Sequence, residues 1–137
     1  MSKMNERSYQ RLSGVDHQLA SVIIDGSHTS PVHYEVTHGV RTIEEQQALY
    51  ALGRTKPGKI VTQCDGIEKK SKHQRDSPKE YGKAVDIVAW VDGKVSWDMA
   101  HYKQIADHLL AVAKEKGVKL VWGGNFKKFK DGPHFEI

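Results

Sequence analysis

The chain has 137 residues, 38% hydrophobic and 28% charged, which is enough for one buried core and too few for a second module. Its net charge of +4 favours a polyanionic partner, which leaves nucleic acid, a membrane surface and the cell wall open. No apolar run approaches the ~20 residues that cross a bilayer, and the polar start lacks the apolar stretch of a secretory signal. We therefore expect one domain over residues 1–137, made in the cytoplasm and without an internal disulfide, since Cys64 is the only cysteine.

The N-terminal half predicts two helices separated by a strand. Apolar residues at helical spacing follow Asp16, a suitable N-cap, and Gly26 is the expected end of that helix. Residues 33–37 have the pattern of a short strand. The sequence Thr42-Ile-Glu-Glu45 is a capping box, in which the Thr hydroxyl and the Glu carboxylate satisfy free N–H groups where a helix begins. This helix is expected to end at Gly53.

A long segment rich in Gly, Pro and Lys occupies residues 53–83, with a short strand expected at 60–61. Loops of this length in compact domains are usually functional or mobile.

The C-terminal half predicts strands around one long helix. Residues 84–91 form the clearest strand, and Asp92-Gly93 indicates a hairpin into residues 94–97. A helix is expected from about Asp98 to Lys116, closed by Gly117. Further strands are expected at 118–122 and 134–137, on either side of a Gly123-Gly124 turn. The predicted fold class is α+β, a small antiparallel sheet with helices packed on one side.

Three polar residues stand out against this pattern. Asp86 interrupts an apolar strand, so its carboxylate needs hydrogen bonds, a cation or a metal as compensation. His134 shares a strand face with Glu136. His73 lies in the basic segment 69–75, whose plain interpretation is a solvated charge run. Spacing alone leaves a structural role open for all three.

The combination of motifs resembles the zinc peptidases that include phage L-alanyl-D-glutamate endolysins and bacterial D-alanyl-D-alanine carboxypeptidases. Their pattern is Ser-x-His-x-x-Gly-x-Ala-x-Asp, followed by an acid-x-x-His. Matching pieces are Ser71-Lys-His73, Gly82-Lys-Ala-Val-Asp86 and Asp131-Gly-Pro-His134, and Gly39-Val-Arg-Thr42 and Trp122-Gly-Gly124 resemble the phage branch. The resemblance covers nearly the whole chain and implies a fold like that of Hedgehog domains and D-Ala-D-Ala peptidases.

One spacing departs from the family pattern. The pattern places its histidine seven positions before the aspartate, whereas His73 and Asp86 are thirteen apart. The extra residues lie within Gln74 to Tyr81 and have the composition of a surface loop. Because closure entropy grows only logarithmically with loop length, such an insertion is compatible with His73 as a ligand.

The resemblance implies a zinc site held by His73, Asp86 and His134. It also implies that Asp131 is the general base, although this residue equally suits the start of an Asp-Gly-Pro turn. Zinc fits the set because neutral imidazole and carboxylate are its ordinary ligands.

Two further residues follow from the same resemblance. Arg41 corresponds to the arginine that faces the scissile carbonyl, against the plain alternative of a helix-entry arginine paired with Glu44 or Glu45. Ser71 is expected to position the His73 loop or to bind a substrate carboxylate. Our own inference from the shared strand face is that Glu136 orients a ligand imidazole.

The function implied is hydrolysis of the L-alanyl-D-glutamate bond of the peptidoglycan stem peptide by a phage endolysin that causes bacterial lysis. Two alternatives keep the fold: a D-alanyl-D-alanine carboxypeptidase, and a non-catalytic zinc domain as in Hedgehog proteins. Nucleic-acid binding rests only on the basic segment and ranks last. We expect a monomer without stable membrane association, which reaches the periplasm and cell wall from the host cytoplasm at lysis.

Overall fold

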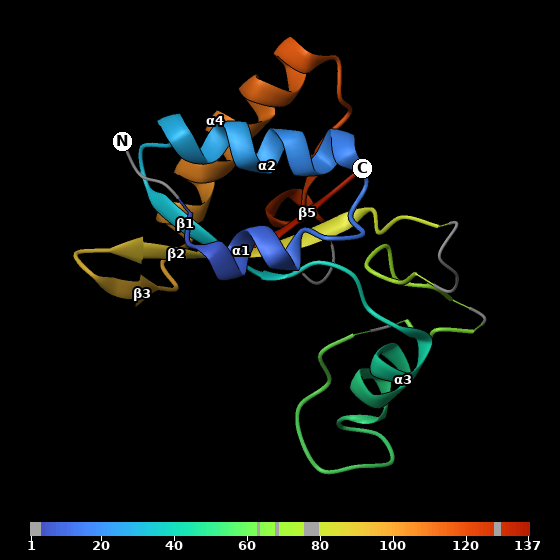
Figure 1. Ribbon diagram of the computed structural model, residues 1–137. Coiled ribbons are helices and arrows are strands. Elements are labelled where there is room, and N and C mark those ends of the chain that lie inside the picture. Colours follow the sequence, from blue (N-terminus) through green and yellow to red (C-terminus); the bar gives the residue numbers. More distant parts are fainter. Residues whose placement is uncertain (1–3, 63, 68, 76–79, 128–129) are drawn as a thin grey trace.

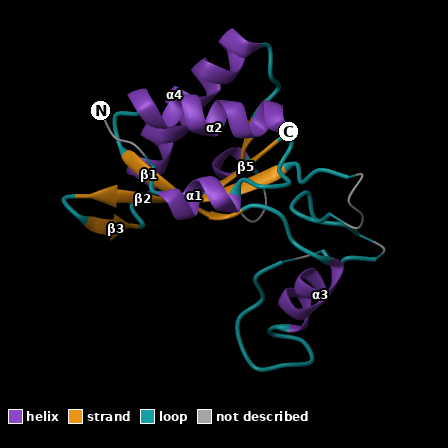
Figure 2. Ribbon diagram, in the orientation of Figure 1, coloured by secondary structure: helices purple, strands orange, loops and turns teal. Residues whose placement is uncertain are grey.

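The computed structural model describes residues 4–62, 64–67, 69–75, 80–127 and 130–137 (Figures 1 and 2). This part of the chain forms a five-stranded antiparallel sheet with helices beside it, which confirms the predicted α+β class. The helices are α1 (Glu6–Arg11), α2 (His17–Thr29), α3 (Ile43–Ala51) and α4 (Met99–Lys116). The strands are β1 (His33–His38), β2 (Ala84–Val91), β3 (Lys94–Ser96), β4 (Val121–Trp122) and β5 (His134–Glu136), and a short 3-10 helix covers Gly123–Asn125.

Strand β2 is the centre of the sheet. The strands follow the order β1-β2-β5-β4, and β3 pairs with the end of β2 that β5 leaves free. The β2–β3 hairpin turns at Asp92 and Gly93, whose φ angles of 54° and 75° are the left-handed values that a tight hairpin turn requires. Every pairing is antiparallel, as the alternating patterns predict.

One face of the sheet is buried under α2 and α4, which both lie on the same side of it in Figure 1. Val85, Ile87 and Phe135 lie in this core and are at most 1% exposed, together with Leu19 and Leu109 from the two helices. Because side chains alternate along a strand, the residues between them point to the opposite face. That second face carries Asp86 and His134.

Helix α1 covers the free edge of β1. The Ser8 hydroxyl accepts a hydrogen bond from the Val36 N–H at 2.9 Å and donates to Glu35 at 2.8 Å, and the Arg11 guanidinium donates to the Val36 carbonyl at 2.9 Å. These side chains satisfy backbone groups that an edge strand otherwise leaves exposed. The sequence analysis did not predict α1, because the segment is short and almost entirely polar.

The structure confirms both predicted ends of α4 but only the predicted start of α2. Asp98 and Gly117 cap α4 as expected, with Gly117 in the left-handed conformation. Asp16 is the N-cap of α2, but Gly26 does not end this helix, which continues to Thr29. Gly26 is instead a contact point with α4, since a Cβ atom there would lie 2.2 Å from a Leu109 methyl carbon. The glycine serves close helix packing and not chain reversal.

The prediction of a strand at 60–61 is also wrong. Ile60 and Val61 are 53% and 59% exposed and have no strand partner, so nothing stabilises an extended ladder there. The strand expected at 118–122 is limited to Val121–Trp122, which is the stretch that pairs with β5. No helix in the described ranges is long and apolar enough to cross a membrane.

Candidate metal centre and active site

Strand register brings two of the three predicted metal ligands together. Asp86 of β2 and His134 of β5 are direct partners in the antiparallel ladder. Direct partners place their side chains on the same face of a sheet, with Cβ atoms ~4.5–5.5 Å apart. Since Phe135 turns into the core, His134 is held on the opposite face beside Asp86.

An irregularity in β1 helps to position the third predicted ligand, His73. Val36 pairs with Ile87, but the next partner of β2 is His38 opposite Asp86, so Thr37 is one extra residue in the strand. The Thr37 hydroxyl donates to the Asp86 carbonyl at 3.2 Å. The chain that leaves this irregularity presents the Gly39 carbonyl to the His73 imidazole, 2.8 Å from its Nδ1.

His73 enters the site from the long loop and is only 2% exposed. Main-chain hydrogen bonds fix its position: the Arg41 N–H donates to the His73 carbonyl at 2.7 Å, and the Ser71 hydroxyl accepts from the His73 N–H at 3.2 Å. The insertion expected within residues 74–81 leaves this geometry intact, and its positions 76–79 lie outside the described residues. The longer spacing to Asp86 therefore does not separate the two side chains.

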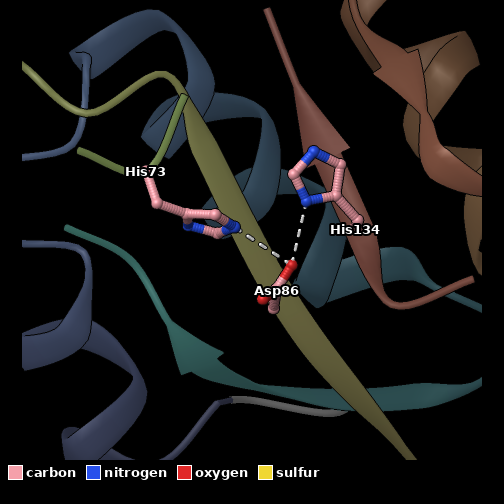
Figure 3. A group of neighbouring side chains, drawn as sticks. All are labelled: His73, Asp86 and His134. Atoms are coloured by element: carbon pink, nitrogen blue, oxygen red, sulfur yellow. Dashed lines mark hydrogen bonds and ion pairs between the residues drawn. The ribbon is translucent and has the colours of Figure 1, made fainter. Parts of the chain in front are cut away.

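The three side chains converge on one point, as Figure 3 shows. Asp86 Oδ1 lies 3.3 Å from His73 Nε2 and 3.1 Å from His134 Nδ1. One ligand atom from each residue lies within 4.8 Å of the others. In a tetrahedral zinc site with bonds of ~2.0–2.2 Å, ligand atoms are ~3.3–3.6 Å apart, so the spacing suits such an ion.

Hydrogen bonds on the far side of each ring leave lone pairs facing Asp86. His73 Nδ1 donates to the Gly39 carbonyl, and His134 Nε2 donates to the Glu136 carboxylate at 2.8 Å. A neutral imidazole has one N–H, so the nitrogens directed at Asp86 are then both acceptors. His73 Nε2 is buried without a hydrogen-bond partner, consistent with this assignment. A cation among these three groups would satisfy all of them, and the donor set fits zinc.

Without a metal ion, protons on the two histidines can supply positive charge next to the Asp86 carboxylate. Burial alone would raise the pKa of Asp86, but hydrogen bonding to His134 and His73 and their charge hold it well below its usual range. Burial would lower the pKa of His134, yet the neighbouring Asp86 carboxylate raises it above the ordinary value. Metal binding must displace such protons, which makes the affinity of the site dependent on pH.

Arg41 borders the cluster and is held by two partners. Its guanidinium donates to Gln46 Oε1 at 3.1 Å and lies 3.5 Å from Asp86 Oδ2. Glu44 and Glu45, the alternative partners considered from sequence, do not take this place: Glu45 completes the capping box with Thr42 instead. Arg41 is thereby directed at the site.

Gln46 is a residue that sequence reasoning missed. It is fully buried, and its side-chain amide donates to the Thr62 hydroxyl at 3.1 Å and the Cys64 carbonyl at 2.8 Å while its oxygen holds Arg41. A buried polar side chain with all its groups paired fixes its neighbours. The only available signal was its position one turn into the predicted helix.

Asp131 lies outside the three-residue cluster but beside it, in the turn that leads to His134. The Trp122 indole donates to the Gly132 carbonyl at 2.7 Å, and a Cβ atom at Gly123 would lie 2.3 Å from the Asp131 carbonyl. The Trp-Gly segment thus packs directly against this turn. Desolvation and the negative charge of Asp86 raise the pKa of the Asp131 carboxyl above its ordinary value, which suits a proton acceptor.

All six residues predicted for the site line one pocket of about 240 Å³. They are Arg41, Ser71, His73, Asp86, Asp131 and His134. Val61 and Phe126 add apolar surface to its walls, and Lys70 and Lys72 add positive charge. The pocket therefore combines a group of side chains that could hold a metal ion with basic groups suited to an anionic ligand.

Two further side chains next to the cluster deserve mention. Glu136 holds His134, and Lys72 Nζ lies 3.0 Å from its other oxygen. Burial would raise the pKa of Glu136, but hydrogen bonds from His134 and Lys72 keep it below the ordinary value. His38 Nδ1 lies 3.9 Å from Asp86 Oδ2, because the extra residue in β1 places His38 opposite Asp86.

An α+β fold with two histidines and one aspartate converging in an open pocket is the arrangement of the mononuclear metallopeptidases. The comparison with known families is specific. The chain belongs to the phage L-alanyl-D-glutamate peptidase family, whose profile matches residues 1–137.

Individual relatives agree with this assignment. The chain is 39% identical over 106 residues to the peptidoglycan L-alanyl-D-glutamate endopeptidase CwlK of Bacillus subtilis (strain 168), a match that covers 74% of this chain and 59% of CwlK. It is 25% identical over 130 residues to the L-alanyl-D-glutamate peptidase of Escherichia phage T5, covering 94% and 85% of the two chains. The chain thus spans little more than half the length of CwlK and most of the phage protein.

A solved structure has the same fold. The L-Ala D-Glu endopeptidase ChiX of Serratia marcescens superimposes with a TM-score of 0.79 at 33% sequence identity. The match covers 98% of this chain and 89% of ChiX. The fold expected from sequence is therefore that of a peptidase of this class.

Proposed function

We propose that residues 1–137 form a catalytic domain that hydrolyses the L-alanyl-D-glutamate bond of the peptidoglycan stem peptide with a zinc ion as cofactor. The observation that carries the proposal is the convergence of His73, Asp86 and His134, with Asp86 Oδ1 3.3 Å from His73 Nε2 and 3.1 Å from His134 Nδ1. The identity of the hydrolysed bond is inferred from the family and from two relatives, which are named as L-alanyl-D-glutamate peptidases. We further propose that the protein acts as a phage endolysin on the bacterial cell wall.

In this proposal His73, Asp86 and His134 would hold the zinc ion at the pocket that they line. A zinc ion in such a site lowers the pKa of water from 15.7 to ~7 and polarises a carbonyl group. The Asp131 carboxylate takes the proton of the attacking water and later delivers it to the leaving amine of D-glutamate. Burial and the Asp86 charge raise the pKa of the Asp131 carboxyl above its ordinary value, a direction that favours proton transfer by a general base.

Arg41 lines the same pocket, and we propose that it supports the same reaction. Its buried Nε has no hydrogen-bond partner among the described residues, and Gln46 and Asp86 fix the guanidinium. We propose that this group stabilises negative charge on the scissile carbonyl oxygen, a contribution of about 3–4 kcal/mol in comparable sites. Ser71, whose hydroxyl accepts from the His73 N–H, keeps the ligand loop in place.

The substrate is anionic, and the pocket offers charges that suit it. Lys70 and Lys72 line the wall next to Ser71, and the chain carries a net charge of +4. These groups attract a stem peptide at low ionic strength and are screened by salt. Nucleic acid and membrane are not partners in this proposal, and the protein acts as a monomer.

The experiment that tests the proposal combines metal analysis with product analysis. Purified protein is expected to contain one zinc ion per chain and to release new L-alanine carboxyl and D-glutamate amino termini from peptidoglycan. Chelation is expected to abolish this release, and added zinc to restore it. Free D-alanine as the product would instead identify a carboxypeptidase.

The variant Asp131→Asn separates an enzyme from a zinc-binding scaffold. It is expected to retain zinc and to lose about a hundredfold to ten-thousandfold in the rate of wall digestion, the usual range for a general base. Asp25→Asn, an exposed acid on α2, is the matched control and is expected to digest the wall like the parent. Unchanged digestion by Asp131→Asn would contradict the proposed base.

A further inference from the structure

Glu136 connects the proposed ligand His134 to Lys72, a lysine that also lines the pocket. One oxygen of its carboxylate accepts from His134 Nε2 at 2.8 Å, and the other pairs with Lys72 Nζ at 3.0 Å. The Glu136 side chain is 17% exposed and that of His134 is 12% exposed, so water competes weakly for these contacts. Glu136 is therefore held at both ends.

Lys72 is the residue directly before His73, on the other side of the site. Its ammonium group also donates to the Ile137 carbonyl at 2.9 Å, and its own carbonyl accepts from the Lys83 N–H at 2.7 Å. The side chain thus spans from the loop that carries one proposed ligand to the strand that carries another. The Lys72 side chain is 49% exposed, so its position is defined by its contacts with β5 and not by burial.

We propose that Lys72 and Glu136 form a positioning pair that selects the nitrogen of His134 offered to the metal. The inference rests on the proposed metal site. With Nε2–H held by Glu136, the imidazole presents its Nδ1 lone pair to Asp86 and the metal, and the ring cannot rotate without breaking that bond. Lys72 holds the second oxygen of the carboxylate, which limits the movement of the oxygen that accepts from His134.

The physical reason is general to metal-bound histidine. A carboxylate that accepts the distal N–H fixes the tautomer and raises the basicity of the ligand nitrogen, and loss of such a partner usually costs ~10–100-fold in metal affinity. A surface lysine–carboxylate pair by itself contributes only ~0.2–1 kcal/mol. Lys72 is therefore expected to act through Glu136 and to have the smaller effect.

The test is the zinc affinity of the intact protein, measured without substrate by competition with a chromogenic chelator. Glu136→Ala is expected to bind zinc ~10–100-fold more weakly than the parent. Glu136→Gln keeps an oxygen acceptor for His134 and is expected to recover part of this loss. Lys72→Met is expected to weaken binding ~2–5-fold, and Lys72→Met combined with Glu136→Ala to bind no more weakly than Glu136→Ala alone.

Two controls distinguish positioning from general effects. Lys59→Met removes the same charge from an exposed place in the loop and is expected to leave the zinc affinity unchanged. The ¹⁵N chemical shifts of the His134 ring at alkaline pH report the tautomer directly. They are expected to show a protonated Nε2 in the parent and a mixture of tautomers in Glu136→Ala.

The outcomes separate this inference from the proposed function. A parent protein that binds no zinc would overturn the metal site and the positioning pair together. If the parent binds zinc and Glu136→Ala binds it equally well, the pair is refuted and the metal site stands. Independent, additive losses for Lys72→Met and Glu136→Ala would show that Lys72 does not act through Glu136.

Discussion

The two halves of the candidate site are built in different ways. Asp86 and His134 stand on neighbouring strands, and their places are fixed by a ladder whose other face is fully buried. His73 and Arg41 stand on loops, and their places are fixed by hydrogen bonds to Gly39, Gln46 and to each other. The sheet half depends on apolar packing, whereas the loop half depends on polar contacts that are satisfied one by one.

The region around α3 shows the second principle most clearly. Gln46 is the one buried residue of this helix, and Ile60 and Ile67 in the following loop are more than half exposed. In Figure 1, α3 and its loop lie apart from the layer formed by α2 and α4. Stability and catalysis should therefore respond differently to substitutions in the two halves.

The largest expected effect comes from the packing behind the sheet half. Phe135→Ala removes a fully buried ring between His134 and Glu136, and we expect it to lower the free energy of unfolding by about 3–5 kcal/mol. Zinc binding should weaken at the same time, because the strand that carries His134 loses its anchor. Denaturant unfolding and chelator competition measure the two effects. A stability loss below about 1 kcal/mol would mean that packing does not hold this half.

An intermediate effect is expected in the loop half. Gln46→Leu leaves Arg41 and the Cys64 carbonyl without their partner, at a cost of about 1–3 kcal/mol in the free energy of unfolding. Because Arg41 is then free to move by about 1 Å, wall digestion should slow ~100-fold while zinc affinity stays close to that of the parent. Steady-state digestion rates and zinc titration separate these quantities. Gln47→Leu, on the exposed side of the same helix, is the control and should digest normally.

The smallest effect is expected where the loop carries exposed apolar residues. Ile67 is 63% exposed, so Ile67→Ser should change the free energy of unfolding by less than about 0.5 kcal/mol. Denaturant unfolding of this variant beside Phe135→Ala gives the comparison a scale. A cost of several kcal/mol for Ile67→Ser would show that the loop half also depends on apolar burial.

The sequence was informative in proportion to how local the determining interactions are. The β2–β3 hairpin, the capping box at Thr42 and the caps of α4 follow from residues a few positions apart, and the structure has all three. The prediction that Gly26 ends α2 failed, because the role of this glycine depends on its contact with Leu109, far along the chain. The extent of the strand near Trp122 likewise depends on a partner, β5, that pattern alone does not reveal.

The same distinction between local and long-range interactions applies to the site residues. The patterns of β2 and β5 single out Asp86 as a polar interruption and place His134 on one face with Glu136, but they do not show that the two strands are neighbours. His73 and Arg41 could be assigned only through the family resemblance, because loop contacts leave no periodic signal. Gln46 and Lys72 were missed as parts of the site, since nothing local distinguishes their side chains from solvated ones.

The extra residue Thr37 makes chain length in β1 a determinant of the chemistry. Were the strand one residue shorter, every position after Val36 would face the other way, and the Gly39 carbonyl that fixes the His73 tautomer would be out of reach. An insertion or deletion there would disable the site while every group proposed to contact zinc or peptide remained in the sequence. Sequence alignments used to transfer function within the family therefore need to preserve the residue count of this strand as well as the identities of the polar residues.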